Sequence, residues 1–105
     1  MYNCKEEMRL KSIMPSSKDI KSMSTFFYAF SDDTRLKIII LLTISPLCVT
    51  EISNVLNVNQ TTVSHQLKIL KSLNIVEYDR NGKSIIYYIK NSEIQDVLNA
   101  CVDCI

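Results

Sequence analysis

The stretch that decides the fold is TEISNVLNVNQTTVSHQLKILK, residues 50–71. Its apolar residues predict two short helices joined by a tight turn, and in the second helix Val63, Leu67 and Leu70 recur at i, i+4 and i+7. That spacing leaves the opposite side of the second helix polar. A pair of helices with this layout is typical of a helix-turn-helix, whose second helix lies in the major groove of DNA.

The polar side of the second helix carries residue types that read DNA. Hydroxyls and imidazole can reach base edges, whereas lysine meets phosphate. Two other interpretations stay open, because any amphipathic surface helix has a polar face and a lone histidine can simply be solvated. The candidates for base contacts are Gln60, Thr61, Ser64 and His65, the phosphate candidate is Lys68, and Thr62 is counted with the DNA-binding residues.

A β-hairpin is predicted directly after this helix. Residues 76–80 and 83–89 are rich in strand formers and flank Asn81-Gly82, the strongest short signal for a hairpin turn. A hairpin that follows a recognition helix is a wing, and Arg80 and Lys83 near its tip are candidates for contacts with phosphate or the minor groove. The predicted fold class is mainly α with a small β-hairpin wing.

Four stretches of the chain resemble a known family. FSDDTRLKIIILL, PLCVTEIS, NQTTVSHQLKILKS and the NGKSIIYYI wing, all within residues 30–89, are similar to the ArsR/SmtB group of winged-helix repressors. The resemblance implies a winged helix-turn-helix of five helices, with the hairpin between the fourth and the fifth. It also implies a homodimer, paired through its terminal helices, that binds a double-stranded DNA operator and leaves it when an inducer, usually a metal ion, binds elsewhere.

Short polar residues predict where the helices begin. Asn59 and Thr50 are expected to be the N-caps of the two helices in the helix-turn-helix, and Asn57 is expected to take the left-handed conformation at the turn. Ser31 is expected to cap an earlier helix that runs to Thr43.

That earlier helix is expected to be the centre of the core. Its run of Ile and Leu at 38–42 also suits a strand, but the cap and the length favour a helix. Arg35 is interpreted as a solvated surface residue, with a phosphate contact as the alternative. Pro46 ends the element.

Apolar stripes mark the first and the last predicted helix. The first begins at Lys18, and its stripe faces either the partner subunit or its own core, two alternatives that one sequence does not separate. The last spans residues 92–105. Residues 1–17 are expected to form a flexible arm, and residues 18–105 one DNA-binding and dimerisation domain. The stripes are Ile20, Met23, Phe27 and Phe30 in the first helix, and Ile94, Val97, Leu98, Cys101 and Ile105 in the last.

Composition and charge agree with one small DNA-binding domain. The chain has 105 residues, 47% of them hydrophobic, with one glycine and a net charge of +1, which predicts a compact and mainly helical domain. Residues 60–90 hold five basic and two acidic side chains, whereas residues 91–105 hold three acidic ones and no basic one. Residues 60–90, which contain the predicted DNA-binding helix and the wing, are therefore the basic part of the chain.

The location is expected to be the cytoplasm. The charged start of the chain does not fit a signal peptide, and no stretch approaches the roughly 20 apolar residues that span a bilayer, so no membrane partner is expected. Four cysteines in a reducing compartment are expected to be thiols or thiolates.

These cysteines are the candidate ligands of an inducer. Cys101 and Cys104 are one helical turn apart and can face one soft ion, although both can also be structural residues, one packed and one frayed. The pair needs further donors, and Glu93 of an antiparallel partner helix is one candidate. The resemblance adds Cys48, at the first cysteine of the family's CVC motif, and Cys4, similar to the arm cysteine that reaches this motif in some members.

The sequence also departs from the family's metal patterns. Thr50 stands where the CVC motif has its second cysteine. The zinc pattern D-x-H followed by H-x-x-H becomes Asn91, Glu93 and Cys104, and the fourth position is absent. A site built from these residues would be rich in sulfur and would prefer a soft ion. Cadmium, lead, zinc and arsenite are the candidates, and the identity of the inducer is open.

Other classes of function are alternatives to a repressor. A thiol oxidoreductase would use Cys101 and Cys104, but such enzymes lower the pKa of a thiol at a helix N-terminus and this pair lies at a C-terminus, so no enzyme is expected. A winged helix that docks other proteins would bind no DNA. A redox or sulfide sensor, in which two cysteines join reversibly, is a variant within the repressor class.

Overall fold

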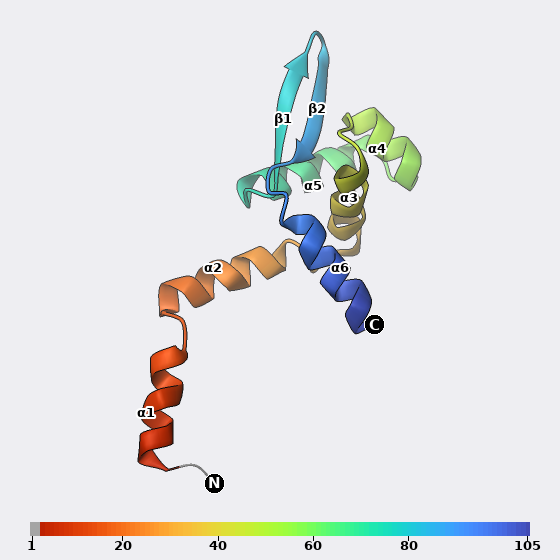
Figure 1. Cartoon of the computed structure of the whole chain (residues 1–105). Helices are drawn as coiled ribbons and strands as arrows, with labels where there is room; N and C mark the ends of the chain where they lie inside the picture. The colour runs from red at the N-terminus through yellow and green to blue at the C-terminus, as the bar shows by residue number, and fades with distance from the viewer. Residues whose placement is uncertain (1–2) are drawn as a thin grey trace.

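The computed structural model describes residues 3–105, which form six helices and two strands. Figure 1 shows one body made of α3 to α6 and the hairpin, from which α2 and then α1 extend outwards. The predicted fold class, mainly α with a hairpin wing, is confirmed. The elements are α1 (Cys4–Ile13), α2 (Ser17–Tyr28), α3 (Asp33–Ile44), α4 (Val49–Leu56), α5 (Gln60–Ser72), β1 (Val76–Asn81), β2 (Ser84–Ile89) and α6 (Ile94–Cys104).

The core lies where α3, α4 and α5 meet the base of the hairpin. The predicted central helix supplies Ile38, Ile39 and Leu42, which confirms that the isoleucine run is helical. The predicted stripe of α5 is also buried in full. The buried apolar residues are Ala29, Ile38, Ile39, Leu42, Ile52, Val63, Leu67, Leu70, Ile75, Val76 and Ile94.

The turn of the helix-turn-helix has the predicted geometry. Asn57 ends α4 with φ 54° and ψ 45°, the left-handed conformation that asparagine tolerates better than most residues. Asn59 then caps α5, because its Oδ1 accepts the backbone N–H of Thr62 at 2.7 Å. Both predictions are confirmed.

Two other predicted caps are wrong. Helix α3 starts one residue later than Ser31 implies, because the Asp32 carboxylate accepts the backbone N–H of Arg35 at 3.1 Å. Helix α4 starts after Cys48, so Thr50 lies inside the helix instead of capping it. At the start of α3 the carboxylate of Asp32, and at the start of α4 the carboxylate of Glu51, lies close to the positive end of the helix and fixes the first turn.

The hairpin has its turn one residue later than predicted. Asn81 pairs with Ser84, so Gly82 and Lys83 are the two turn residues. Gly82 has φ +64° and Lys83 has a negative φ, which is the pattern of a type II′ turn, whereas a turn at Asn81-Gly82 would need positive φ at both. At the base, Leu47 and Tyr87 exchange backbone hydrogen bonds of 3.0 and 2.8 Å, which attach the wing to the segment before α4.

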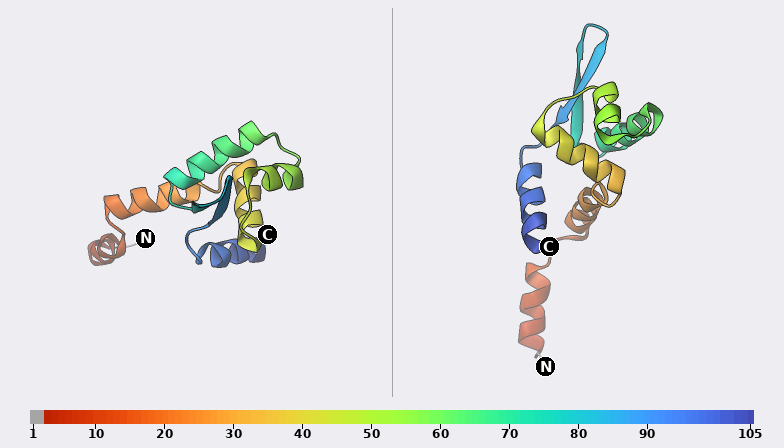
Figure 2. Two further views of the ribbon diagram at one scale, coloured as in Figure 1. Left: turned by 90° about the horizontal axis from the view of Figure 1, so that it is seen from above. Right: turned by 90° about the vertical axis from the view of Figure 1, so that its right-hand side faces the viewer.

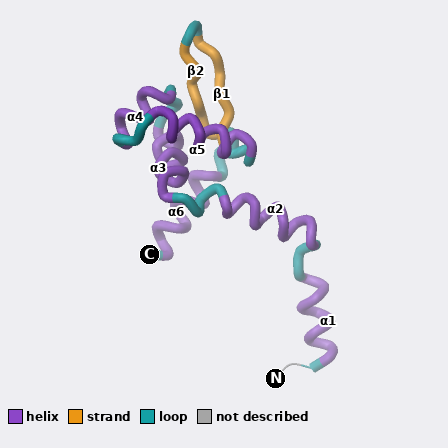
Figure 3. The backbone as a smooth tube through the Cα atoms, turned by 180° about the vertical axis from the view of Figure 1, so that it is seen from behind, coloured by secondary structure: helices purple, strands orange, loops and turns teal. Residues whose placement is uncertain are grey.

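Helix α1 was not predicted. Asn3 caps it, and Lys11 lies 3.1 Å from Glu7, so it is supported by local polar contacts rather than by an apolar stripe that a sequence pattern would reveal. Figures 2 and 3 show α1 projecting beyond the rest of the molecule. With α1 included, the extents are 62 × 28 × 22 Å. The flexible arm and the boundary at residue 17 stay predictions.

The apolar stripes of α2 and α6 are largely open. No residue of α2 is buried, and Phe30, with the neighbouring Phe26, attaches only its C-terminal end to the core. In α6, Ile94 is buried, but Cys101 and Ile105 at the other end of the seam are exposed. These helices therefore present an uncovered apolar surface. Among the described residues no helix combines the length and the apolar character needed to cross a bilayer.

Candidate nucleic-acid interface

Helix α5 presents the predicted polar face to solvent. The exception is Thr62, which is half-buried and whose backbone N–H is bound by the cap at Asn59. Gln60 is exposed, but its Nε2 donates to Oγ1 of Thr50 at 3.4 Å, so its side chain turns back towards α4. The exposed candidates on α5 are Gln60, Thr61, Ser64, His65 and Lys68.

The wing lies against the C-terminal end of this helix. Nζ of Lys71 is 3.5 Å from Oε1 of Glu77 and 5.4 Å from the centre of the Tyr78 ring, so a lysine of α5 contacts β1 twice. The backbone N–H of Tyr78, and then Lys71, hold the pKa of the Glu77 carboxyl below its usual range. Arg80 and Lys83 are exposed towards the far end of the wing, with Lys83 in the turn itself.

Arg35 is not the solvated surface residue that the sequence indicated. Its side chain is 5% exposed, and it is the one buried charged residue of the described chain. It donates hydrogen bonds to carbonyls of Tyr28 and Ala29 and to side-chain oxygens of Ser31 and Gln66. The sequence contained a signal for this burial, because a helix that is apolar nearly all round is buried. A cation on such a helix needs hydrogen-bond acceptors from the protein itself.

Gln66 was absent from the predicted site altogether. It lies on α5 between the buried stripe and the exposed face, and its Oε1 accepts from Arg35 at 3.3 Å. The partner is 31 residues away in the sequence, so no local pattern identifies the pair.

The candidate metal ligands are accessible, but no three of them gather within one described chain. All four cysteines are free thiols; Cys48 is half-buried at the start of α4 and the other three are exposed. Glu93, also exposed, precedes α6. Helix α1, which begins with Cys4, lies at the opposite end of the molecule from α4 (Figure 1). Within residues 3–105, no three side chains from Cys, His, Asp and Glu gather in a way that could hold a metal ion.

The start of α4 has its own electrostatic feature. The backbone N–H of Cys48 donates to Oε1 of Glu51 at 3.0 Å. This bond, with a contribution from the thiol of the same cysteine, holds the pKa of the Glu51 carboxyl below its usual range. The contact fixes the entry into the first helix of the helix-turn-helix.

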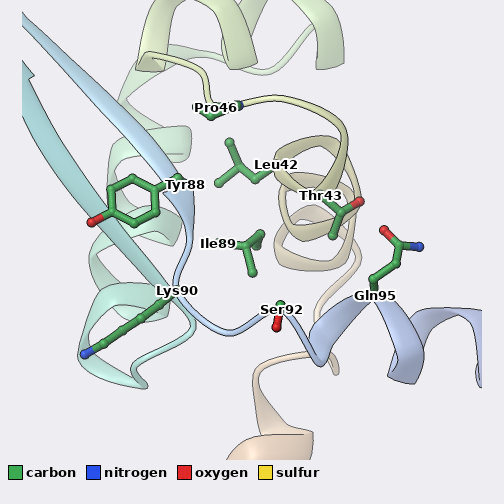
Figure 4. A pocket seen from close by; sticks show the side chains of 8 residues that line it. All are labelled: Leu42, Thr43, Pro46, Tyr88, Ile89, Lys90, Ser92 and Gln95. Carbon is green, nitrogen blue, oxygen red and sulfur yellow. The ribbon is translucent and has the colours of Figure 1, made fainter.

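Two pockets lie beside α6, and neither has the donors of a metal site. The first, about 490 Å³, opens between α3, β2 and α6, and no sulfur, imidazole or carboxylate lines it (Figure 4). The second, about 500 Å³, lies between α3 and α6 and is mainly apolar, with Cys101 as its one sulfur. The first pocket is lined by Leu42, Thr43, Pro46, Tyr88, Ile89, Lys90, Ser92 and Gln95.

Comparisons with known proteins agree with this geometry. The profile of the family described as bacterial regulatory protein, arsR family, matches residues 32–78. The cadmium resistance transcriptional regulatory protein CadC of Listeria innocua is 38% identical over 86 residues, which cover 81% of this chain and 72% of that protein. A transcriptional repressor SmtB homolog of Synechocystis is 31% identical over 83 residues, covering 79% of this chain and 63% of the other.

A solved structure extends the agreement to the whole fold. The homodimeric winged helix-turn-helix DNA-binding domain of Mb0332 from Mycobacterium bovis, described as a possible ArsR-family transcriptional regulator, superimposes with a TM-score of 0.74 at 25% identity. The match covers 87% of this chain and 90% of that one. With its buried α5 stripe, exposed polar face and adjoining wing, the chain belongs to the arsR family of bacterial regulatory proteins and is a DNA-binding transcriptional repressor, not an enzyme.

Proposed function

We propose that the protein acts as a homodimer on a twofold-symmetric operator. One observation carries this proposal: α5 exposes a continuous polar face over a fully buried apolar stripe, beside a wing with two exposed basic residues. Each subunit would place α5 in one of two successive major grooves, about one helical turn apart. The cytoplasm, where such a repressor meets its operator, is the proposed location.

The open stripes of the terminal helices support the dimer. Ile20, Met23 and Phe27 of α2 and Val102 and Ile105 near the end of α6 are all exposed in the single chain. Large apolar side chains left open along the helices of a small domain mark an interaction site, and a second copy would cover them with the same residues. The homodimeric domain from Mycobacterium bovis is consistent with this pairing.

Two kinds of substitution test the proposed reading of DNA. Ser64→Ala or His65→Ala should lower the preference for the operator over random DNA, by about 1–3 kcal/mol where the base contact exists. Lys83→Ala should weaken binding to every sequence and flatten its dependence on salt, since a phosphate contact is lost. Fluorescence anisotropy with an operator duplex and a random duplex measures both effects.

The salt dependence also separates this proposal from a protein-docking winged helix. A docking module would show no salt-dependent binding to either duplex. Unchanged operator preference in both Ser64→Ala and His65→Ala would contradict the proposed groove contacts.

We propose further that a soft metal ion or metalloid releases the operator by binding cysteine thiolates. The chemistry of the donors supports a soft ion, because the described chain offers four free thiols and its one histidine lies on α5. The candidate ligands are Cys48, Cys101, Cys104, Cys4 and Glu93, and the second subunit would have to complete the set, since one chain does not gather three of them. Relatives named for cadmium and arsenical resistance are consistent with this chemistry.

The ion would act through the angle between the subunits. Binding at thiolates of two chains would favour an arrangement of the dimer in which the two α5 helices no longer fit one operator together. The free energy of operator binding would have to differ by about 1–3 kcal/mol between the ion-free and the ion-bound dimer. The candidate ions are cadmium, lead, zinc and arsenite.

Titration of the reduced protein on its operator tests the inducer. One of the four ions should release the DNA, and Cys48→Ser or the pair Cys101→Ser with Cys104→Ser should abolish the release while leaving operator binding intact. Release by peroxide with a loss of two mass units, and without any ion, would favour the thiol redox sensor instead, since peroxide is reduced to water as the two thiols join. No response to any ion or oxidant would leave a constitutive repressor.

A further inference from the structure

The guanidinium of Arg35 bonds two helices at once. Its Nε donates to the Ala29 carbonyl at 3.3 Å and its Nη2 to the Tyr28 carbonyl at 3.1 Å, both at the C-terminal end of α2. Its Nη1 donates to Oε1 of Gln66 on α5 at 3.3 Å. The side chain itself belongs to α3. The end of α2 and the recognition helix are therefore held by one rigid, planar group.

Packing alone does not account for a charge at this position. Among the described residues, no carboxylate lies within ion-pair distance of Arg35. Its charge is balanced by the negative end of the α2 dipole and by the Tyr28 ring, whose centre is 4.8 Å from the guanidinium carbon. An apolar side chain of similar length would avoid the cost of burying a cation. What it could not do is donate in two directions with fixed geometry.

We propose that Arg35 is a positioning residue that sets the orientation of α5 relative to α2 through Gln66. The proposal rests on the proposed function, in which α2 pairs the subunits and α5 reads the operator. Because α2 is fixed at the dimer interface, the bond from Arg35 to Gln66 fixes how far apart the two recognition helices lie. It therefore determines which spacing between half-sites the dimer accepts.

The test uses full-length variants and two duplexes. The first duplex is selected by the wild-type protein from a random library, and the second has the same half-sites one base pair farther apart. Gln66→Met removes the acceptor but keeps the length of the side chain. It should bind the selected duplex about tenfold more weakly, which corresponds to roughly 1.4 kcal/mol, because the two recognition helices would no longer be held at the selected spacing before binding. Binding to the second duplex should change less, so discrimination between spacings should shrink.

Two further variants separate positioning from a contact of Gln66 with DNA. Arg35→Lys keeps the charge but lacks the planar fork, and combined with Gln66→Met it should weaken binding to the selected duplex little more than Arg35→Lys alone. Gln66→Glu keeps an oxygen acceptor for Arg35. It should preserve the discrimination between spacings even if its charge weakens binding to both duplexes. Arg9→Lys, at an exposed position of α1, is the matched control.

The outcomes distinguish the two proposals. Additive effects of Arg35→Lys and Gln66→Met, or unchanged discrimination in Gln66→Met, would overturn the role of Arg35 and leave the proposed function standing. If the wild-type protein selected no duplex from the library, the proposed function itself would fail, and this inference with it. Circular dichroism and sedimentation confirm that each variant compared is a folded dimer.

Discussion

Glu51 shows how a single side chain fixes the start of the helix-turn-helix. Its carboxylate accepts the backbone N–H of Cys48 at 3.0 Å, and this bond lowers its pKa in the folded protein. A carboxyl whose pKa is lower in the folded than in the unfolded state stabilises the fold above the unfolded pKa. That stabilisation is lost as pH falls through the folded pKa.

This direction of the pH dependence of stability leads to a prediction for Glu51→Gln. The variant should be less stable than the wild type at pH 7, because the charge-assisted bond to Cys48 is weakened, and the difference should shrink as pH falls below 4.5, the ordinary pKa of the carboxyl. Urea unfolding across this range, followed by circular dichroism, measures the difference in the free energy of unfolding. Asp103→Asn, exposed near the end of α6, is the control. A difference that stayed constant from pH 7 to pH 3 would show that the carboxylate charge has no part in the cap.

At the scale of elements, the periodic patterns of apolar residues identified the helix faces that are buried by packing. The stripe of α5 was predictable because the spacing of Val63, Leu67 and Leu70 and their burial are the same property. The residues at which the helices begin were not predictable, because several possible capping residues stand side by side and the folded chain selects among them. The bond between Arg35 and Gln66 joins residues far apart in sequence, so only the fold reveals it.

The hairpin allows a test of whether the local sequence signal or the observed strand register locates the turn. The Asn81-Gly82 signal located the turn to within one residue, and the register then moved it to Gly82 and Lys83. Because Gly82 has φ +64° and Asn81 does not have positive φ, Gly82→Ala should destabilise the wing by about 1–2 kcal/mol, whereas Asn81→Ala should be close to neutral. Amide hydrogen exchange in β1 and β2 reports the stability of the wing. Equal losses in the two variants would contradict the observed register.

For the whole molecule, the main feature is how much apolar surface one chain leaves open. The core holds α3, α4, α5 and the base of the wing together, while α2 contributes no buried residue and α6 only Ile94. A domain of this size gains little stability from its own core, so a second copy that covers these helices would add burial where the single chain lacks it. The same helices would then determine the separation of the two reading heads.

Substitution of Phe27 tests this dependence of DNA binding on pairing. Phe27 is 59% exposed on α2 although it belongs to the apolar stripe. Phe27→Glu should weaken the dimer at least about 30-fold, the loss expected when an aromatic residue central to an interface is removed. The helical content of each chain should stay unchanged, since the side chain is not part of the core. Operator affinity should fall with the dimer, while binding to a single half-site should remain.

Val55→Glu is the matched control for this substitution. Val55 is 62% exposed on α4 and lies outside both stripes, so the same change from an apolar to a charged side chain there should leave the dimer intact. Sedimentation equilibrium over a range of protein concentrations measures both dissociation constants. If Phe27→Glu dimerised as tightly as Val55→Glu, the stripe of α2 would have no part in pairing. The spacing of the two reading heads would then have to be set by α6 alone.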